Sequence, residues 1–494
     1  MPPIDKSFEV HDQFQFEMKL DYWLSRDRRA DYQVDMYLFL PNSLDVNPGS
    51  YPRSSFYGDI KNYVRLKTPE VDLGLVPSLA EGQPGGRLRK SIDQWLQDPH
   101  DKAYGRVAEY HAMMYTSITA RALWNGLAEI TANPDATHLR EFVDETEAAL
   151  ALLRTLSAQV TRASGPALGD DHRPPTILSS ADEYLTAEAG QILLRFLAAI
   201  KNGPPEPELD LAVVIDSIRS LQDHAQAMNH ATMVGDDEDL IFRHSVHKKF
   251  FRSHLFLKQR SKAEGQVVNQ VSMGIAAGLS MVFATLIAFL AQQRFGNFTL
   301  PLFVALVVGY VFKDRIKDLT RLYLEKWLSR RIFDSKTHFF DKEERRMGSC
   351  REMVRYVGKG QVPEDVQALR HVGHVTEIAN FWQLEQVIHY RKKISLFRKP
   401  LQRINPGYHT KAVNDIIRIN IKRLLWNMDE PAKEILTLGD DDTVKSVTGA
   451  RIYKINLVVQ LESRTGKKSL RFRLVLDRNG IRRMQEVSPL HPDN

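Results

Sequence analysis

The chain has 494 residues, of which 43% are hydrophobic and 26% charged, and it carries a net charge of +6 at neutral pH. This length fits two to four ordinary domains, and the polar composition excludes a protein built mainly of membrane spans. A single cysteine, Cys350, excludes an intrachain disulfide and a cysteine-rich metal centre. The first residues lack the basic and apolar segments of a signal peptide, so we expect large domains in a reducing cytoplasm.

Residues 1–90 are predicted to form a β-hairpin followed by loops. Apolar and polar side chains alternate across 13–20 and again across 32–40, which is typical of two strands with one buried face. Residues 41–90 are rich in Pro, Gly and Ser, which favour turns. Because an isolated hairpin is only marginally stable in water, we expect it to join the C-terminal strands in one sheet.

Residues 91–235 are predicted to form a helical bundle. Helix breakers separate four segments with helical periodicity, at 91–131, 136–163, 177–202 and 209–232. Their lengths and connections are typical of an antiparallel arrangement. The acidic run at 236–239 has the residue types of a metal site, but the first turn of the next helix is the better interpretation.

Residues 240–340 are predicted to form a juxtamembrane stalk that carries two transmembrane helices, 271–291 and 295–312. Both segments are uncharged, and about 20 helical residues cross a bilayer core of about 30 Å. Basic residues flank the pair on both sides, whereas the loop holds only Arg294. The positive-inside rule therefore places both termini in the cytoplasm, at the inner membrane in a prokaryote. The alternatives are a buried helical hairpin, or stalk helices that lie flat on the membrane.

Gly274 and Gly278 form a small-residue face on the first predicted span. Such a face allows close helix packing, either against the second span or against another copy of the chain. We therefore expect a homo-oligomer. No charged residue lies inside either span, which argues against an ion relay.

Residues 341–433 are predicted to be helical, and residues 434–494 to form a β-meander. The helical pattern covers 364–399 and 409–428. Alternation over 453–461, 470–476 and 481–487, with an Asn479-Gly480 turn, predicts three antiparallel strands. The predicted fold class is thus α+β, with a two-pass membrane helical hairpin inserted between cytoplasmic helical and β regions.

No catalytic motif is found, including a nucleophile elbow, a dinucleotide fingerprint and a kinase signature. The run 464–469 resembles the end of a phosphate-binding loop, but it lacks the earlier glycine and is better explained as a hairpin turn. His371, His374 and Glu377 have helical spacing without the HExxH pattern, so ordinary histidines are favoured over a metal site. No metal is predicted, and no cofactor is indicated.

Basic side chains of the C-terminal meander form the predicted anion site: Lys467, Lys468, Arg471, Arg473, Arg482 and Arg483. Arg471 and Arg473 share one strand face, and basic clusters suit the phosphate of a lipid headgroup or a nucleotide. A second basic cluster covers 391–403. The alternative is a solvated positive face, or a partner for the acidic 136–150 helix.

These features favour a membrane-anchored cytoplasmic binding, regulatory or scaffold protein that responds to an anionic ligand. Its expected partners are membrane lipids, an anionic headgroup or nucleotide, and further copies of itself, but not nucleic acid. One alternative is an oligomeric channel or membrane-perturbing effector gated by its cytoplasmic domains. Another is an enzyme whose residues form no recognisable motif.

Overall fold

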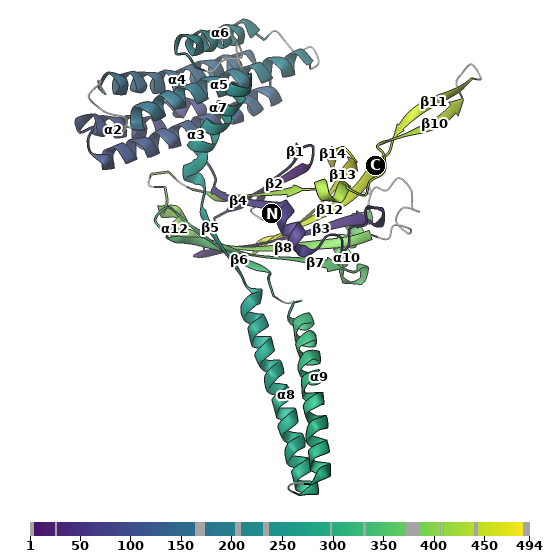
Figure 1. Ribbon diagram of the computed structural model, residues 1–494. Helices are drawn as coiled ribbons and strands as arrows, with labels where there is room; N and C mark the ends of the chain where they lie inside the picture. Colours follow the sequence, from purple (N-terminus) through teal and green to yellow (C-terminus); the bar gives the residue numbers. More distant parts are fainter. Residues whose placement is uncertain are drawn as a thin grey trace. The chain divides into compact units, whose positions relative to one another are not determined.

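The computed structural model describes residues 4–24, 27–163, 173–202, 209–230, 237–296, 299–329, 332–371, 385–405, 407–408, 410–438 and 443–487. The chain divides into two compact units (Figure 1). The first, here called the β unit, contains residues 1–64, 257–404 and 412–494. The second, the helical unit, contains residues 65–256 and 405–411.

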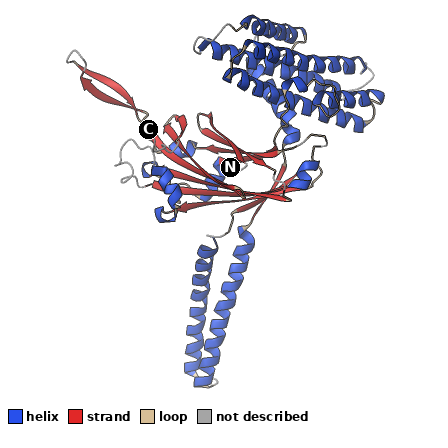
Figure 2. Cartoon of the chain, turned by 180° about the vertical axis from the view of Figure 1, so that it is seen from behind, coloured by secondary structure: helices blue, strands red, loops and turns tan. Residues whose placement is uncertain are grey.

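An eight-stranded antiparallel sheet with the strand order β14-β13-β12-β3-β8-β7-β6-β5 dominates the β unit (Figure 2). Its strands are β3 (Arg29–Pro41), β5 (Lys258–Ala263), β6 (Ser335–Phe340), β7 (Arg346–Val357), β8 (Glu385–Phe397), β12 (Tyr453–Ser463), β13 (Gly466–Asp477) and β14 (Gly480–Glu486). The last three strands form the meander that the alternating pattern predicts. β12 also pairs with β3, so an N-terminal strand does join the meander.

A second sheet has the strand order β1-β2-β9-β4. Its strands are β1 (Ile4–Asp12), β2 (Gln15–Trp23), β4 (Ile60–Leu66) and β9 (Ala412–Asn420). Side chains of the two sheets meet: the Phe8 ring stacks on Phe472 with 4.0 Å between centroids, and Tyr22 lies 5.0 Å from Tyr32. The core of the β unit therefore lies between the inner faces of the sheets. A separate ribbon of β10 (Ala432–Leu438) and β11 (Val444–Ala450) is exposed along both strands.

The outer face of the eight-stranded sheet is covered over only part of its length. Helix α10 (Glu364–His371) and the residues before it pack Val362 and Val366 against Tyr37, Val387 and Val458. Shorter elements of this unit are η1 (Asn42–Leu44), α1 (Arg53–Asp59), η4 (Lys359–Gln361), α12 (Arg398–Arg403) and η5 (Lys422–Leu425). On the other part of the outer face, where β3 begins and β8 ends, Arg29, Arg351 and Lys393 are exposed, and among the described residues no helix covers them; we call this the open part.

Two parts of the β unit differ from the sequence prediction. The alternating segments at 13–20 and 32–40 are not partners, since the first belongs to β2, which pairs with β1 and β9, and the second to β3. The prediction of helices over 364–399 and 409–428 is confirmed at 364–371, where α10 lies, but it is wrong at 385–397 and 412–420, which form β8 and β9. In β8, Ile388, Tyr390, Ile394 and Leu396 alternate on a buried face, and a buried lysine at 392 hides this period of two.

The helical unit consists of α2 (Pro84–Gln97), α3 (Lys102–Ala132), α4 (Ala136–Ala163), α5 (Arg173–Asn202), α6 (Leu211–Ala227) and α7 (Asp237–Arg252), with η2 (Leu73–Leu75) and η3 (Ser253–Leu255). Pro84 begins α2, and the Asp101 carboxylate caps α3 by accepting from the Ala103 amide at 2.6 Å. Apolar stripes at helical spacing, such as Leu178 and Leu185 in α5, are fully buried.

Helices α8 (Gly265–Phe295) and α9 (Leu300–Ser329) form a pair, seen side by side in Figures 1 and 2. Of the described helices, only α8, over Gln270–Phe295, is long and apolar enough to cross a membrane. In α9 the charged residues Lys313, Asp314 and Arg315 follow after 13 uncharged residues, about 20 Å of helix and short of the roughly 30 Å required. The predicted two-pass membrane hairpin, and with it the two-span location with both termini in the cytoplasm, is therefore wrong. The channel alternative required the same two spans.

The close approach between α8 and α9 involves a different glycine from those predicted. A Cβ at Gly309 would lie 3.1 Å from Ile287 Cγ2, so the two backbones approach closely there. A Cβ at Gly274 or Gly278 would meet no atom within 4 Å. Within one chain, these two glycines therefore face away from the partner helix.

Candidate functional site

Arg471, a central member of the predicted anion site, is buried. It is 2% exposed, and its guanidinium donates to the carbonyl oxygen of Leu369 at 3.0 Å and to Asn456 Oδ1 at 2.8 Å. Burial, with the nearby charges of Arg473 and Arg370, lowers the pKa of Arg471 to about 10. The outer face that carries Arg471 is the part covered by α10, so this side chain holds structure rather than meeting solvent.

Two of the other predicted anion-binding residues pair with carboxylates of the chain. Lys467 donates to Asp365 at 2.7 Å, and Arg482 to Asp477 at 2.6 Å. Arg473 and Lys468 are half-buried, while Arg483 is exposed. Two of the six cations are thus neutralised within the chain.

The second basic cluster is divided between the two faces of the eight-stranded sheet. Arg391 donates to Asp35 Oδ1 at 2.5 Å, and Lys392 is buried on the inner face. Lys393 instead lies on the open part of the outer face. This division follows from the period of two, which points consecutive side chains of a strand in opposite directions.

Four basic residues lie in direct cross-strand register on this open part, and we call them the cationic row. Lys262 lies opposite Lys336, Lys336 opposite Arg351, and Arg351 opposite Lys393. Like charges placed opposite each other on one face of a sheet destabilise it. The row is therefore an electrostatic cost that the fold alone does not require.

Carboxylates neutralise only the middle of the cationic row. Glu264 lies 3.1 Å from Arg351 and 3.9 Å from Lys336. Among the described residues, neither Lys262 nor Lys393 has a carboxylate within salt-bridge distance. The ends of the row thus keep charges that an external anion would neutralise.

Beside the row lies a pocket of about 610 Å³, here called the sheet pocket. Its lining has six basic side chains against two acidic ones, namely Arg29, Lys336, Arg346, Arg351, Lys393 and Arg464 against Asp31 and Glu462. Ser349 adds a hydroxyl group, which donates readily to anionic oxygens, whereas the Ser395 hydroxyl already donates to Asp31 at 2.6 Å. The lining therefore combines positive charge with a neutral donor.

Not all of these cations are available to a ligand. Arg29 pairs with Asp31 at 2.7 Å, and Arg464 pairs with Asp27 at 2.8 Å. Arg346 lies over the Phe397 ring, 5.4 Å from its centroid, and forms no salt bridge in the part of the chain that the structure describes. Arg346 and Lys393 are thus the pocket cations without a carboxylate partner.

The pKa of His338, which lies on β6 two residues after Lys336, is affected by the positive charges of this face. Burial lowers this pKa, and the charges of Arg346, Lys336 and Lys262 lower it further. Protonation of His338 is therefore disfavoured on this face. The face retains its positive field without help from histidine protonation.

Sequence reasoning missed most of this site. Lys262 is one of the basic residues that flank the first predicted span, and Lys336 and Arg351 lie on β6 and β7, strands that the sequence does not predict. The alternation of Lys258, Arg260 and Lys262 was the available signal for β5. Only the pairing of four strands brings these cations together.

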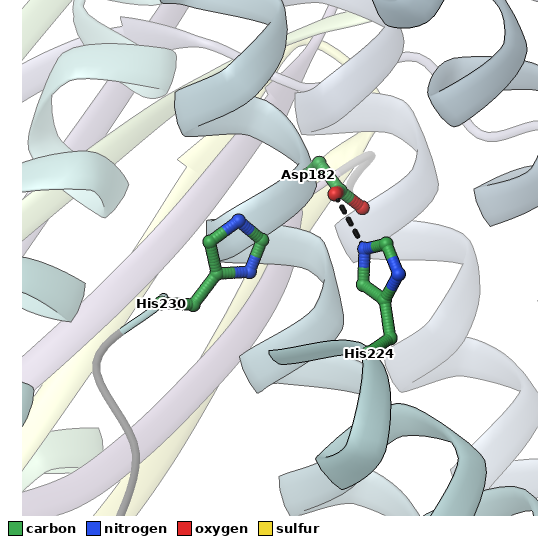
Figure 3. Close-up of side chains that lie close together, drawn as sticks. All are labelled: Asp182, His224 and His230. Atoms are coloured by element: carbon green, nitrogen blue, oxygen red, sulfur yellow. Dashed lines mark hydrogen bonds and ion pairs between the residues drawn. The ribbon is translucent and has the colours of Figure 1, made fainter. Parts of the chain in front are cut away.

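A different cluster lies in the helical unit, where Asp182, His224 and His230 meet (Figure 3). His224 Nε2 lies 2.7 Å from Asp182 Oδ2, and Arg154 donates to the other carboxylate oxygen at 3.0 Å. His230 lines a neighbouring pocket of about 820 Å³. His371, the one described member of the histidine motif considered in the sequence, ends α10 and is not part of this cluster, whereas His374 and Glu377 lie outside the described residues.

Comparison with known proteins adds no assignment. No protein-family model matches the chain, and no curated protein is significantly similar to it in sequence. The functional argument therefore depends on the site geometry.

Proposed function

We propose that this chain is a binding protein for an anionic, phosphate-bearing ligand that docks on the cationic row and the sheet pocket. The observation that carries the proposal is the register of Lys262, Lys336, Arg351 and Lys393 across four adjacent strands. A binding function of this kind explains why an unfavourable row of like charges is placed on an open face.

The chemistry of the row favours phosphate over a lone carboxylate. Neighbouring strands lie about 4.8 Å apart, so four strands spread the row over about 14 Å, enough for several charged oxygens or more than one phosphate. Arg346 and Arg351 offer planar guanidinium groups that donate two hydrogen bonds to one phosphate, while the lysines act as point charges. Ser349 lies in the same pocket as a further donor.

Two sources supply such a ligand: a soluble nucleotide and the headgroup of an anionic lipid. Both present the same phosphate chemistry to the row. The predicted role as a regulatory or scaffold protein rests on this binding step, because a bound anion would relieve the repulsion and stabilise the sheet.

The test compares two double variants that remove the same charge. Arg351→Gln/Lys393→Gln alters the cationic row, and Lys468→Gln/Arg483→Gln alters the C-terminal meander. Binding of ATP by calorimetry and of phosphatidylglycerol vesicles by co-sedimentation would be measured for the full chain. We expect the row variant to bind at least about tenfold more weakly, which corresponds to about 1.4 kcal/mol, and the meander variant to bind like the wild type.

The two probes distinguish the sources of phosphate, and salt tests the mechanism. Binding should weaken as salt rises, because the Debye length falls from about 10 Å at 0.1 M to about 3 Å at 1 M. Binding lost in the meander variant but kept in the row variant would transfer the site to the predicted meander residues. Binding of neither probe, or equal binding by both variants, would overturn the proposal.

Stability measurements separate a binding defect from a folding defect. Lys393→Gln removes a charge that faces Arg351 and has no carboxylate partner among the described residues. In low salt we expect this variant to be more stable than the wild type by about 0.2–1 kcal/mol. A variant that gains stability and loses ligand affinity cannot have failed through unfolding.

A further inference from the structure

The C-terminal end of α6 and the turn that follows it bring His224 and His230 together beside Asp182. Asp182 lies on α5 and His224 on α6, which ends at Ala227. Beyond this end, Asn229 adopts a left-handed conformation with φ of 54°, and the His230 amide donates to the Ala225 carbonyl at 2.9 Å. This hydrogen bond and that from Asn229 to Gln226 form a Schellman turn. The turn returns His230 beside His224, with 5.8 Å between the ring centroids.

The three side chains point toward one another, as Figure 3 shows. One ligand atom from each residue lies within 4.8 Å of the other two. The Asp182 side chain is buried, whereas His224 and His230 are partly exposed. The three groups are therefore close enough together to be candidates for holding one metal ion.

His230 has an unsatisfied nitrogen in this cluster. Its Nδ1 atom is buried and has no hydrogen-bond partner among the described residues. A buried polar nitrogen without a partner carries a desolvation cost that a bound ion would remove.

Neighbouring groups hold the Asp182 carboxylate in place. Arg154 Nε donates to Oδ1 at 3.0 Å, and the Thr186 hydroxyl donates to the same oxygen at 3.2 Å. Oδ2 is thereby directed to His224. Such outer contacts orient the ligands of many metal sites.

We propose that Asp182, His224 and His230 bind a divalent transition-metal ion, with Zn²⁺ the ion that fits best. Two imidazoles and one carboxylate supply the three protein ligands of a tetrahedral zinc site whose fourth position is open to water. Arg154 reduces the negative charge of the single carboxylate, which disfavours Ca²⁺ and Mg²⁺, ions that depend on several oxygen ligands. The pocket that His230 lines gives the ion access to solvent and to a water ligand.

The same unit contains a matched pair that lacks the third ligand. His244 Nε2 lies 2.8 Å from Glu188 Oε2, and Trp124 donates to Glu188 Oε1 at 2.7 Å. This pair has the same kind of histidine–carboxylate contact as His224 and Asp182. It therefore controls for the effect of removing a paired histidine without removing the proposed metal site.

Zn²⁺ binding by the purified, metal-stripped full chain would be measured by competition with a chromophoric chelator, with one ion per chain expected. Replacement by Co²⁺ should give the visible absorption of a site with nitrogen and oxygen ligands. We expect His230→Gln and Asp182→Asn to weaken Zn²⁺ binding more than about 100-fold, since outer contacts alone are worth about 10- to 100-fold. His244→Gln should bind like the wild type, and Ca²⁺ should not compete.

Folding of each variant would be checked by circular dichroism. His230→Gln removes an imidazole whose Nδ1 makes no hydrogen bond to the described residues, so its helix content should stay unchanged. Weak, non-stoichiometric Zn²⁺ binding by the wild type would overturn the proposal. Equal affinities for wild type, His230→Gln and Asp182→Asn would overturn it as well.

Discussion

Lys392 and Lys393 are consecutive in the sequence but lie on opposite faces of β8. Lys392 is 1% exposed, and its ammonium group donates to Asp415 Oδ1 at 2.8 Å between the two sheets. Lys393 is exposed and faces Arg351 on the outer side. One lysine therefore joins the core, while its neighbour supplies the charge of the proposed anion site.

The buried pair of Lys392 and Asp415 should be sensitive to loss of one partner. Burial alone would lower the pKa of Lys392, but Asp415 and Glu352 outweigh it and hold the pKa above its ordinary value. We expect Lys392→Met to lower the free energy of unfolding by about 3–5 kcal/mol, because Asp415 is left buried without its cation. The measurement is urea denaturation followed by fluorescence.

A double variant provides the control for this prediction. Lys392→Met/Asp415→Leu removes both charges, and replacement of a buried ion pair by apolar residues is often neutral or better. Most of the lost stability should return. A double variant no more stable than Lys392→Met would show that Asp415 is held mainly by Tyr22, whose hydroxyl donates to it at 3.0 Å.

Stability of the helical unit should fall in mild acid because of His111. Burial, together with the charge of Arg87, lowers the pKa of this imidazole to about 4, from an ordinary value of 6.5. Between these values the unfolded chain binds a proton that the folded chain does not. The stabilisation is complete above pH 6.5, declines as the pH falls, and is fully lost near pH 4. Its upper limit is about 3 kcal/mol.

His111→Gln should remove most of this acid dependence, because glutamine does not take up a proton in this pH range. Its amide can still bond to the Tyr408 hydroxyl, which lies 3.1 Å from His111 Nδ1, so the variant should remain folded. His100→Gln, at an exposed position, serves as the control and should keep the dependence. Thermal unfolding from pH 4 to pH 7 measures the effect. Parallel pH profiles for wild type and His111→Gln would contradict the assignment.

The glycines of α8 and α9 should respond differently to substitution. Gly309→Val places side-chain atoms against Ile287, where even a Cβ would lie 3.1 Å from Cγ2, and should loosen the helix pair. Gly278→Ala meets open space and should strengthen α8 by up to about 1 kcal/mol through helix propensity. Amide hydrogen exchange in α8 would be faster in the first variant and unchanged or slower in the second. Faster exchange in Gly278→Ala alone would instead support the predicted packing face of Gly274 and Gly278.

The sequence by itself determined the local elements whose pattern is strong. The alternation over 453–487 and the Asn479-Gly480 turn predicted β12, β13 and β14, because strand side chains alternate and the turn residues tolerate positive φ. Helix breakers likewise separated α3, α4, α5 and α6, but the sequence prediction joined part of α2 to α3 in one segment over 91–131. The long apolar run of α8 was also evident, but the sequence overestimated its neighbour, whose charges begin too early in α9.

Only the tertiary structure decided which charged residues reach solvent. Alternation placed Arg471 opposite the apolar face, yet α10, about a hundred residues away in the chain, covers it. The cationic row joins residues 262 to 393, and the Asp182 cluster joins three positions on two helices and a turn. Periodicity describes each element alone, whereas exposure and convergence depend on which distant elements pack against it. That choice is made by long-range burial and strand pairing, which leave no local signal.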